Sequence, residues 1–160
     1  MKNPGTHPDG IQVLNRQRRY RIHREAVASF CAGLLRTLDR PALNVSVVFV
    51  SARKMRAMNR QYLGRDYATD VLSFCYEDAA VEESALMGEI VVAPEVAVRQ
   101  AGDCGEDPAR ELRQLLVHGL LHLLGYDHET DRGRMNRVQA RLMRQEPHNL
   151  PALADLEALR

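Results

Sequence analysis

Residues 107–128 read DPARELRQLLVHGLLHLLGYDH, and a helix is predicted to fill most of this stretch. Asp107 and Pro108 form a strong helix start, because the Asp side chain accepts from free N–H groups and proline supplies the helical φ. Gly125 suits the left-handed position that ends a helix, so we expect the helix to run to about Leu124. Apolar side chains surround it, which places it at the centre of the predicted core: Leu112, Leu115, Leu116, Leu120, Leu121, Leu123 and Leu124.

Shorter predicted elements flank this helix on both sides. Four runs rich in β-branched, aromatic or other apolar residues are typical of strands: 11–14, 43–50, 71–76 and 88–93. The alternation within 43–50 predicts a strand with one buried face. Helical patterns cover a segment through Val27 and Leu35, a segment from Ser51 to Gly64, a segment opened by Pro94, residues 131–144, and a short terminal segment from Pro151.

These elements predict an α+β fold, because about four strands and about five helices follow one another without regular alternation. We expect a small mixed sheet packed with the helices, and a single domain over residues 1–160, since a chain of this length fills one core. Residues 1–10 are polar and rich in Pro and Gly, and we expect them to be flexible. The acidic residues 77–83 are predicted to form an exposed connection.

Nothing in the sequence predicts a membrane protein. No stretch approaches the roughly 18 consecutive apolar residues that a spanning helix needs, and the first residues do not resemble a secretory signal. The cysteines, Cys31, Cys75 and Cys104, are odd in number and form no Cys-x-x-Cys pair. A soluble protein of the reducing cytoplasm fits this usage best.

The formal net charge of +1 conceals an uneven distribution. Residues 1–60 carry 12 Lys and Arg against three Asp and Glu. Residues 61–110 are acidic, and residues 111–160 carry equal numbers of basic and acidic residues. The basic third could bind a polyanion such as RNA, or it could be a solvated helix face. Charge alone leaves both interpretations open.

Three histidines fall within eleven positions and give the strongest functional signal. His118 and His122 are four residues apart, so both project from one face of the predicted helix. The chain reverses at Gly125, and His128 can return as a third ligand. Three imidazoles leave one position of a tetrahedral zinc ion open for water, as in catalytic sites. Nickel or another transition metal would also accept these ligands.

Other interpretations of this cluster are possible. The histidines could be partly buried helix residues with hydrogen-bonded rings. Asp127 could orient a ligand histidine or cap the following turn. The spacing is also that of the metzincin proteases, but Gly119 stands where their catalytic Glu would be. A protease of this type would need another acid, such as Glu89 or Asp127.

The motif from His118 to His128, HGLLHLLGYDH, resembles the signature of the YbeY endoribonucleases, bacterial factors of ribosomal RNA maturation. Residues 59–74, NRQYLGRDYATDVLSF, are similar to the family's central segment, and residues 88–92, GEIVV, are similar to its third block. The resemblance is clearest over residues 44–144. The histidine motif is its most specific part.

The resemblance implies one α+β domain with a small mixed sheet and one zinc ion held by the three histidines. It implies a zinc-dependent endoribonuclease specific for single-stranded RNA, acting in maturation of the 3′ end of 16S rRNA and in ribosome quality control. The implied partners are the small ribosomal subunit and a ribosome-associated GTPase. The expected catalytic residues are His118, Arg65 and Asp127, and the expected RNA contacts are Arg60, Arg65, Thr69, Asp70 and Ser73.

The chain departs from the family pattern at two positions. Many members have arginine directly after the tyrosine, where this chain has Leu63, so Arg65 or Arg60 is expected to contact the phosphate instead. Cys75 replaces the usual proline after Ser-Phe. Thr69, Asp70 and Ser73 could equally cap the start of a strand.

Two other functions compete with the nuclease hypothesis. The first is a ribosome assembly factor in which the metal is structural and intrinsic activity is weak. The second is a metallopeptidase, favoured by the histidine spacing and opposed by Gly119.

Overall fold

The computed structural model describes residues 10–41, 43–76, 86–147 and 149–157. A four-stranded mixed sheet has the order β1-β3-β5-β4. The strands β1 (Ile11–Asn15), β3 (Asn44–Phe49) and β5 (Leu86–Val92) are parallel, and β4 (Val71–Cys75) is antiparallel to β5 at the edge. The described helices are α1 (Arg24–Thr37), α2 (Ala52–Leu63), α3 (Pro94–Cys104), α4 (Pro108–Leu123) and α5 (Arg134–Arg144). The predicted α+β fold is confirmed.

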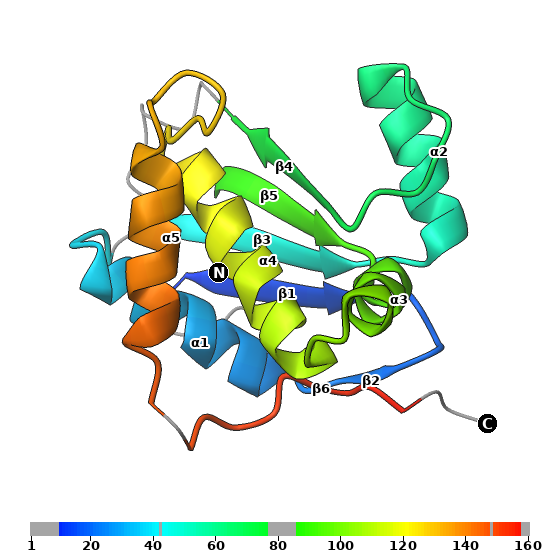
Figure 1. Cartoon of the computed structure of the whole chain (residues 1–160), viewed down its shortest axis with the longest axis horizontal. Coiled ribbons are helices and arrows are strands. Elements are labelled where there is room, and N and C mark those ends of the chain that lie inside the picture. Colours follow the sequence, from blue (N-terminus) through cyan, green and yellow to red (C-terminus); the bar gives the residue numbers. More distant parts are fainter. Residues whose placement is uncertain (1–9, 42, 77–85, 148, 158–160) are drawn as a thin grey trace, which may run out of the picture.

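The central helix α4 crosses one face of the sheet, with α5 beside it and α2 beyond the β4 edge (Figure 1). Side chains of β3 and β5 alternate between two apolar clusters. Val47 and Ile90 pack in the larger cluster with the leucines of α4, whereas Val48 and Val91 pack in a second cluster with Met55 of α2. The prediction that residues 43–50 bury one face is therefore wrong, because apolar side chains pack against both faces of β3.

Local signals placed the ends of α2 and α4 correctly. Ser51 Oγ accepts from the Lys54 backbone N–H at 3.2 Å and begins α2, and Gly64 ends it at φ 66°. Asp107 accepts from the Ala109 backbone N–H at 3.0 Å and begins α4. Gly125 follows α4 at φ 88°, as the sequence predicted.

The C-terminal predictions need two corrections. The described residues 151–157 form no helix: Ala154–Asp155 is the strand β6, which pairs with β2 (Arg21–Ile22), and Asp155 accepts from His23 at 2.8 Å. The last helix begins at Arg134 and not at 131, because Asp131 accepts from the Met135 backbone N–H at 2.8 Å in the preceding turn. Both departures depend on contacts that a local pattern does not contain.

Two predictions from the sequence concern segments that lie outside the described residues. These are the flexible 1–10 segment, apart from Gly10, and the 77–83 connection. None of the described helices is both long and apolar enough to cross a membrane.

Candidate metal centre

The three histidines of the motif converge at the C-terminal end of α4. Nε2 of His118 and Nε2 of His122 are 3.1 Å apart, one helical turn from each other. His128 comes from the turn after α4, and its ring centroid lies 5.5 Å and 5.2 Å from those of His118 and His122. One ring nitrogen from each of the three histidines can be chosen so that these three nitrogens all lie within 4.8 Å of one another. The predicted convergence is confirmed.

The chemistry and spacing of these nitrogens fit one transition-metal ion. Two nitrogens bound to a tetrahedral zinc ion at about 2.0–2.1 Å are themselves about 3.4 Å apart, which is close to the 3.1 Å between the Nε2 atoms of His118 and His122. Burial and the neighbouring His118 and His128 lower the pKa of His122. At neutral pH this ring is therefore neutral, which is the form that binds metal.

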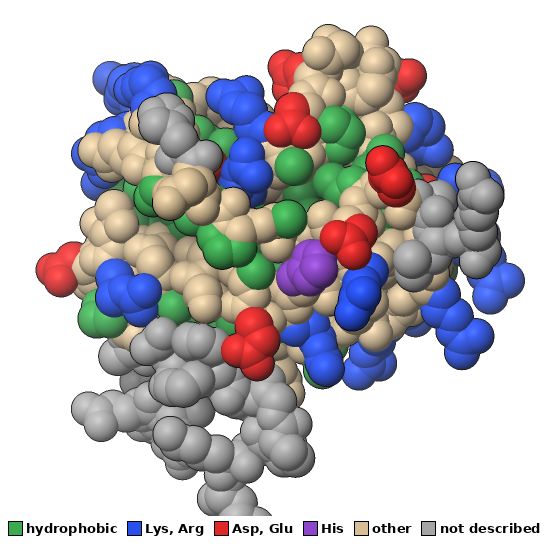
Figure 2. Space-filling view, turned by 90° about the horizontal axis from the view of Figure 1, so that it is seen from below, with side chains coloured by type: hydrophobic (Ala, Val, Ile, Leu, Met, Phe, Trp, Pro, Cys, Tyr) green, Lys and Arg blue, Asp and Glu red, His purple; other side chains and the backbone are tan. Residues whose placement is uncertain are grey.

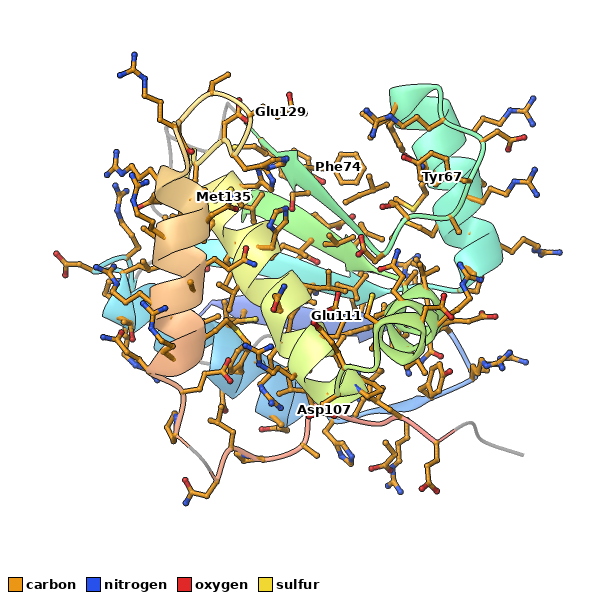
Figure 3. All side chains as sticks on the ribbon, in the orientation of Figure 1. Tyr67, Phe74, Asp107, Glu111, Glu129 and Met135 are labelled. Carbon is orange, nitrogen blue, oxygen red and sulfur yellow. The ribbon has the colours of Figure 1, made fainter. Side chains whose placement is uncertain are left out.

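The turn after α4 places His128. Gly125 donates to the His122 carbonyl at 3.0 Å, and Tyr126 donates to the Leu121 carbonyl at 3.0 Å. The two oxygens of Asp127 then accept from the Glu129 backbone N–H at 3.0 Å and from the Thr130 hydroxyl at 3.1 Å. Figure 3 shows Glu129 in this turn, above the adjoining ends of α4 and α5.

Asp127 therefore caps the turn, which is one of the two roles that its sequence position allowed. The bond from the Glu129 backbone N–H is the main cause that lowers the pKa of its carboxyl group. Its carboxylate is exposed and its hydrogen bonds are to the turn. A catalytic role for Asp127 stays a prediction.

Gln139 of α5 orients His118, one of the three candidate ligands, and the sequence did not single it out. Its Oε1 lies 3.0 Å from Nδ1 of His118, so the ring donates through Nδ1 and leaves Nε2 free to face the other two histidines. One signal was available in the sequence. Gln139 lies four residues after Met135 and three before Leu142, so it is a polar residue on the apolar inner face of a helix.

We expect Gln139→Leu to weaken metal binding by about 10- to 100-fold, the usual effect of losing the partner of a ligating histidine. Gln139→Glu keeps the acceptor and should stay within a few-fold of the unmodified protein. Competition with a chromogenic chelator measures both affinities, and circular dichroism checks the fold. Equal affinities for the Leu and Glu variants would show that this hydrogen bond does not position His118.

A cleft of about 440 Å³ opens beside the three histidines. Side chains from α2, β4 and the loop between them complete its lining, among them Leu63, Arg65, Thr69, Asp70 and Ser73. Four of the five predicted RNA contacts thus lie in the cleft. Some are also held by the fold, because Asp70 accepts from the Val71 backbone N–H at 2.7 Å and Ser73 donates to the Gly119 carbonyl at 3.3 Å.

The structure does not bring Arg60, the fifth predicted contact, into this cleft. Asn59 and Leu63 of α2 line the cleft, whereas Arg60 lines a separate hollow on the outer side of the same helix. The reason is helical geometry, because adjacent residues point about 100° apart. Of the two arginines expected to replace the missing one, the structure therefore places only Arg65 in the cleft, and its contact with a phosphate stays a prediction.

Glu89, one of the two acids considered as the general base of a protease, lies on the face of the sheet opposite to α4 and the histidines. Its neighbour Ile90 faces α4, where it would contact any side chain added at Gly119, so Glu89 points the other way. Phe74, its partner on β4, points towards α2 and contacts Tyr62 with 5.0 Å between ring centroids (Figure 3). Burial raises the pKa of Glu89, but the sheet separates this carboxyl group from the histidines.

Comparison with known proteins gives one consistent result. The family model described as Endoribonuclease YbeY matches residues 12–146. The chain is 33% identical over 150 residues to a protein of Thermodesulfovibrio yellowstonii, covering 83% of this chain and 94% of the relative. It is 36% identical over 140 residues to a protein of Alkaliphilus metalliredigens, covering 81% and 90%. Both relatives bear the name Endoribonuclease YbeY.

Other alignments cover less of the relative. A protein of the same name from Anaeromyxobacter dehalogenans is 37% identical over 142 residues, covering 88% of this chain and 68% of the relative. Among solved structures, the solution structure of a structural-genomics target protein from Thermotoga maritima matches with a TM-score of 0.60 and 27% identity. That match covers 83% of this chain and 86% of the other.

Proposed function

The chain belongs to the YbeY family of endoribonucleases, and from this premise we propose that it is a zinc-dependent enzyme specific for single-stranded RNA. Family membership makes it an RNA-cleaving hydrolase. The proposal adds the metal, the strand preference, and a role in 16S rRNA 3′-end maturation and ribosome quality control. The main support is the convergence of His118, His122 and His128 at a cleft that also holds Arg65.

Each cleft residue receives a role in this proposal. The three histidines hold the metal, and Gln139 keeps Nε2 of His118 directed towards it. A bound zinc ion would lower the pKa of a water molecule and stabilise negative charge on a phosphate oxygen. The Arg65 guanidinium binds the phosphate next to the scissile bond and stabilises the charge that develops there. Leu63 and Leu123 supply apolar walls.

The nucleophile is either water or the adjacent RNA 2′-hydroxyl, and the products distinguish them. Attack by the 2′-hydroxyl passes through a cyclic phosphate, whereas attack by water leaves a 5′-phosphate or 3′-phosphate end directly. The experiment incubates the zinc-loaded protein with single-stranded and double-stranded forms of a 16S 3′ precursor and analyses the ends by mass spectrometry. Cleavage confined to the single strand is expected, and equal cleavage of both forms would contradict the proposed preference.

We expect Arg65→Ala to lower kcat/KM on single-stranded RNA by about 10- to 100-fold, because a hydrogen bond to a charged group is worth about 1.5–3 kcal/mol. Arg60→Ala is the matched control and should have little effect, since Arg60 lies outside the cleft. Adding Leu63→Arg to Arg65→Ala restores the family's arginine at a cleft position and should recover part of the rate. A larger loss with Arg60→Ala than with Arg65→Ala would reverse the assignment.

The proposed partners and compartment follow from this role. A protein that matures 16S rRNA would meet the small ribosomal subunit, and a ribosome-associated GTPase is the proposed protein partner. Ribosomes assemble in the bacterial cytoplasm, and Cys31, Cys75 and Cys104 are all free thiols, as expected in a reducing compartment.

The metallopeptidase alternative loses support. Of the two acids considered as its general base, Glu89 lies across the sheet and Asp127 caps a turn. Incubation of the zinc-loaded protein with casein and, in parallel, with an RNA oligonucleotide tests this directly, and we expect cleavage of the RNA alone.

A further inference from the structure

A stripe of four arginines runs along the outer side of α5: Arg134, Arg137, Arg141 and Arg144. They are three, four and three residues apart, so they share one face of the helix, and all four are exposed. The helix contains no Asp or Glu. Figure 2 shows one group of basic side chains at the upper left, on the side of the molecule where Figure 1 places α5.

The arginine stripe has no acidic partner in the parts of the chain that the structure describes. Arg137 donates to the Arg132 carbonyl at 3.2 Å, and the Arg134 guanidinium lies 5.3 Å from the centre of the Tyr126 ring. Neither contact neutralises charge. By contrast, Arg113 of the adjacent α4 pairs with Glu146 at 3.0 Å.

The stripe is unfavourable for the isolated helix. Like charges three or four residues apart repel each other on a helix surface. A cation in the first turn, as Arg134 is, also opposes the helix dipole, and no acidic residue accompanies it there. A merely solvated surface normally mixes both signs. A bound polyanion would remove the repulsion, so the pattern suits a surface that binds one.

The stripe lies away from the cleft. Gln139 contacts His118 from the inner side of α5, and the helical period of about 100° per residue puts the arginines on the opposite side. Arg134 and Arg144 are ten positions apart, which is about 15 Å along the axis and long enough to follow several phosphates. Arg40 extends this surface, because it shares a hollow of about 210 Å³ with Arg134 and Tyr126.

From these observations we propose that the arginine stripe of α5 binds the RNA backbone outside the cleavage cleft. This inference rests on the proposed function and adds where the substrate is held. Arginine suits the task because its planar guanidinium pairs bidentately with phosphate. Binding through phosphates carries no sequence preference. RNA that extends beyond the cleft therefore gains affinity, and an oligonucleotide that only fills the cleft does not.

The test replaces all four stripe arginines with Gln and compares two substrates with the zinc-loaded protein. A long single-stranded RNA should show a KM at least about 10-fold higher with kcat unchanged, since several phosphate contacts are lost. A short oligonucleotide should be cleaved as before. The salt dependence of long-RNA binding should also become shallower, with a log–log slope reduced by up to about 3, or about 0.7 for each phosphate contact.

A stripe variant that changes only Arg137 and Arg141 to Gln is compared with a matched control that changes Arg99 and Arg110 to Gln, two exposed arginines outside both the stripe and the basic third of residues 1–60. The control variant should retain most of the affinity for long RNA. A further stripe variant with four lysines keeps the charge and should keep the salt slope. Melting curves check that all variants fold.

Two results would overturn this assignment. Equal losses in the two-residue stripe variant and its matched control would show an effect of net charge alone. An unchanged KM and salt slope in the stripe variant would show that the stripe does not bind RNA, and an acidic protein surface would be the remaining partner. The binding measurement needs no cleavage, so a protein that binds long RNA through the stripe without cutting it contradicts only the proposed function.

Discussion

His118→Ala is expected to abolish cleavage of single-stranded RNA and to weaken zinc binding by more than about 100-fold, the upper range for losing only the partner of a ligand. His118 supplies one of three converging ring nitrogens, and its Nε2 lies 3.1 Å from that of His122. The variant should stay folded, because His118 lies at the edge of the cleft and not in the apolar clusters. Chelator competition and a cleavage time course measure the two effects.

The control for this variant is His23→Ala. His23 is half exposed and pairs with Asp155 at the other sheet, so its loss should leave zinc binding and cleavage intact. The result for His118→Ala also distinguishes the two proposed functions, an enzyme and an assembly factor whose metal is structural. A folded, ribosome-bound His118→Ala protein without cleavage supports the enzyme. Unchanged cleavage would indicate a contaminating nuclease and remove the support for catalysis.

Gly119→Glu is expected to lower the free energy of unfolding by more than about 3 kcal/mol, because it buries an unpaired carboxylate against the sheet. A Cβ at this position would lie 2.7 Å from Cγ2 of Ile90, which belongs to a rigid β-branched side chain. The Glu side chain would therefore point at β5 and not at the metal. Chemical denaturation measures the loss, and a casein assay should detect no gain of peptidase activity.

Two further variants test this explanation. Gly119→Ala adds only the Cβ and should cause a smaller loss, within the range of about 1–3 kcal/mol for overpacking. Gly102→Ala in α3 meets no atom within 4 Å and should stabilise the protein by about 0.5–1 kcal/mol, through helix propensity alone. A stable Gly119→Glu protein would show that α4 can move away from the sheet.

The parts of the fold that were predictable from the sequence depend on local chemistry. Asp107 and Pro108 start α4 and Gly125 ends it, since caps and left-handed glycines act within a few residues. The histidine cluster was predictable for the same reason, because one helical turn and one reversal of the chain bring the rings together. These features need no knowledge of how distant segments pack.

What was missed depends on packing between distant segments. Gln139 follows its partner by 21 residues and reaches it only because α5 packs on α4. The face on which Glu89 lies is set by strand register, and the C-terminal strand exists only because β2 offers it an edge. The arginine stripe was not apparent from the sequence, because residues 111–160 contain equal numbers of basic and acidic residues. The fold of α5 places four of the arginines on one face without an acidic residue among them.

The most direct test of the metal centre measures the bound zinc and the cleavage of RNA in the same protein samples. Native mass spectrometry and a cleavage assay are applied to the wild-type protein and to His122→Ala after zinc loading. We expect one zinc ion per wild-type chain, none on the variant, and cleavage only where zinc is present. A wild-type protein that holds no metal under any loading condition, or that cleaves RNA fully after chelation, would contradict a metal-dependent site at His118, His122 and His128.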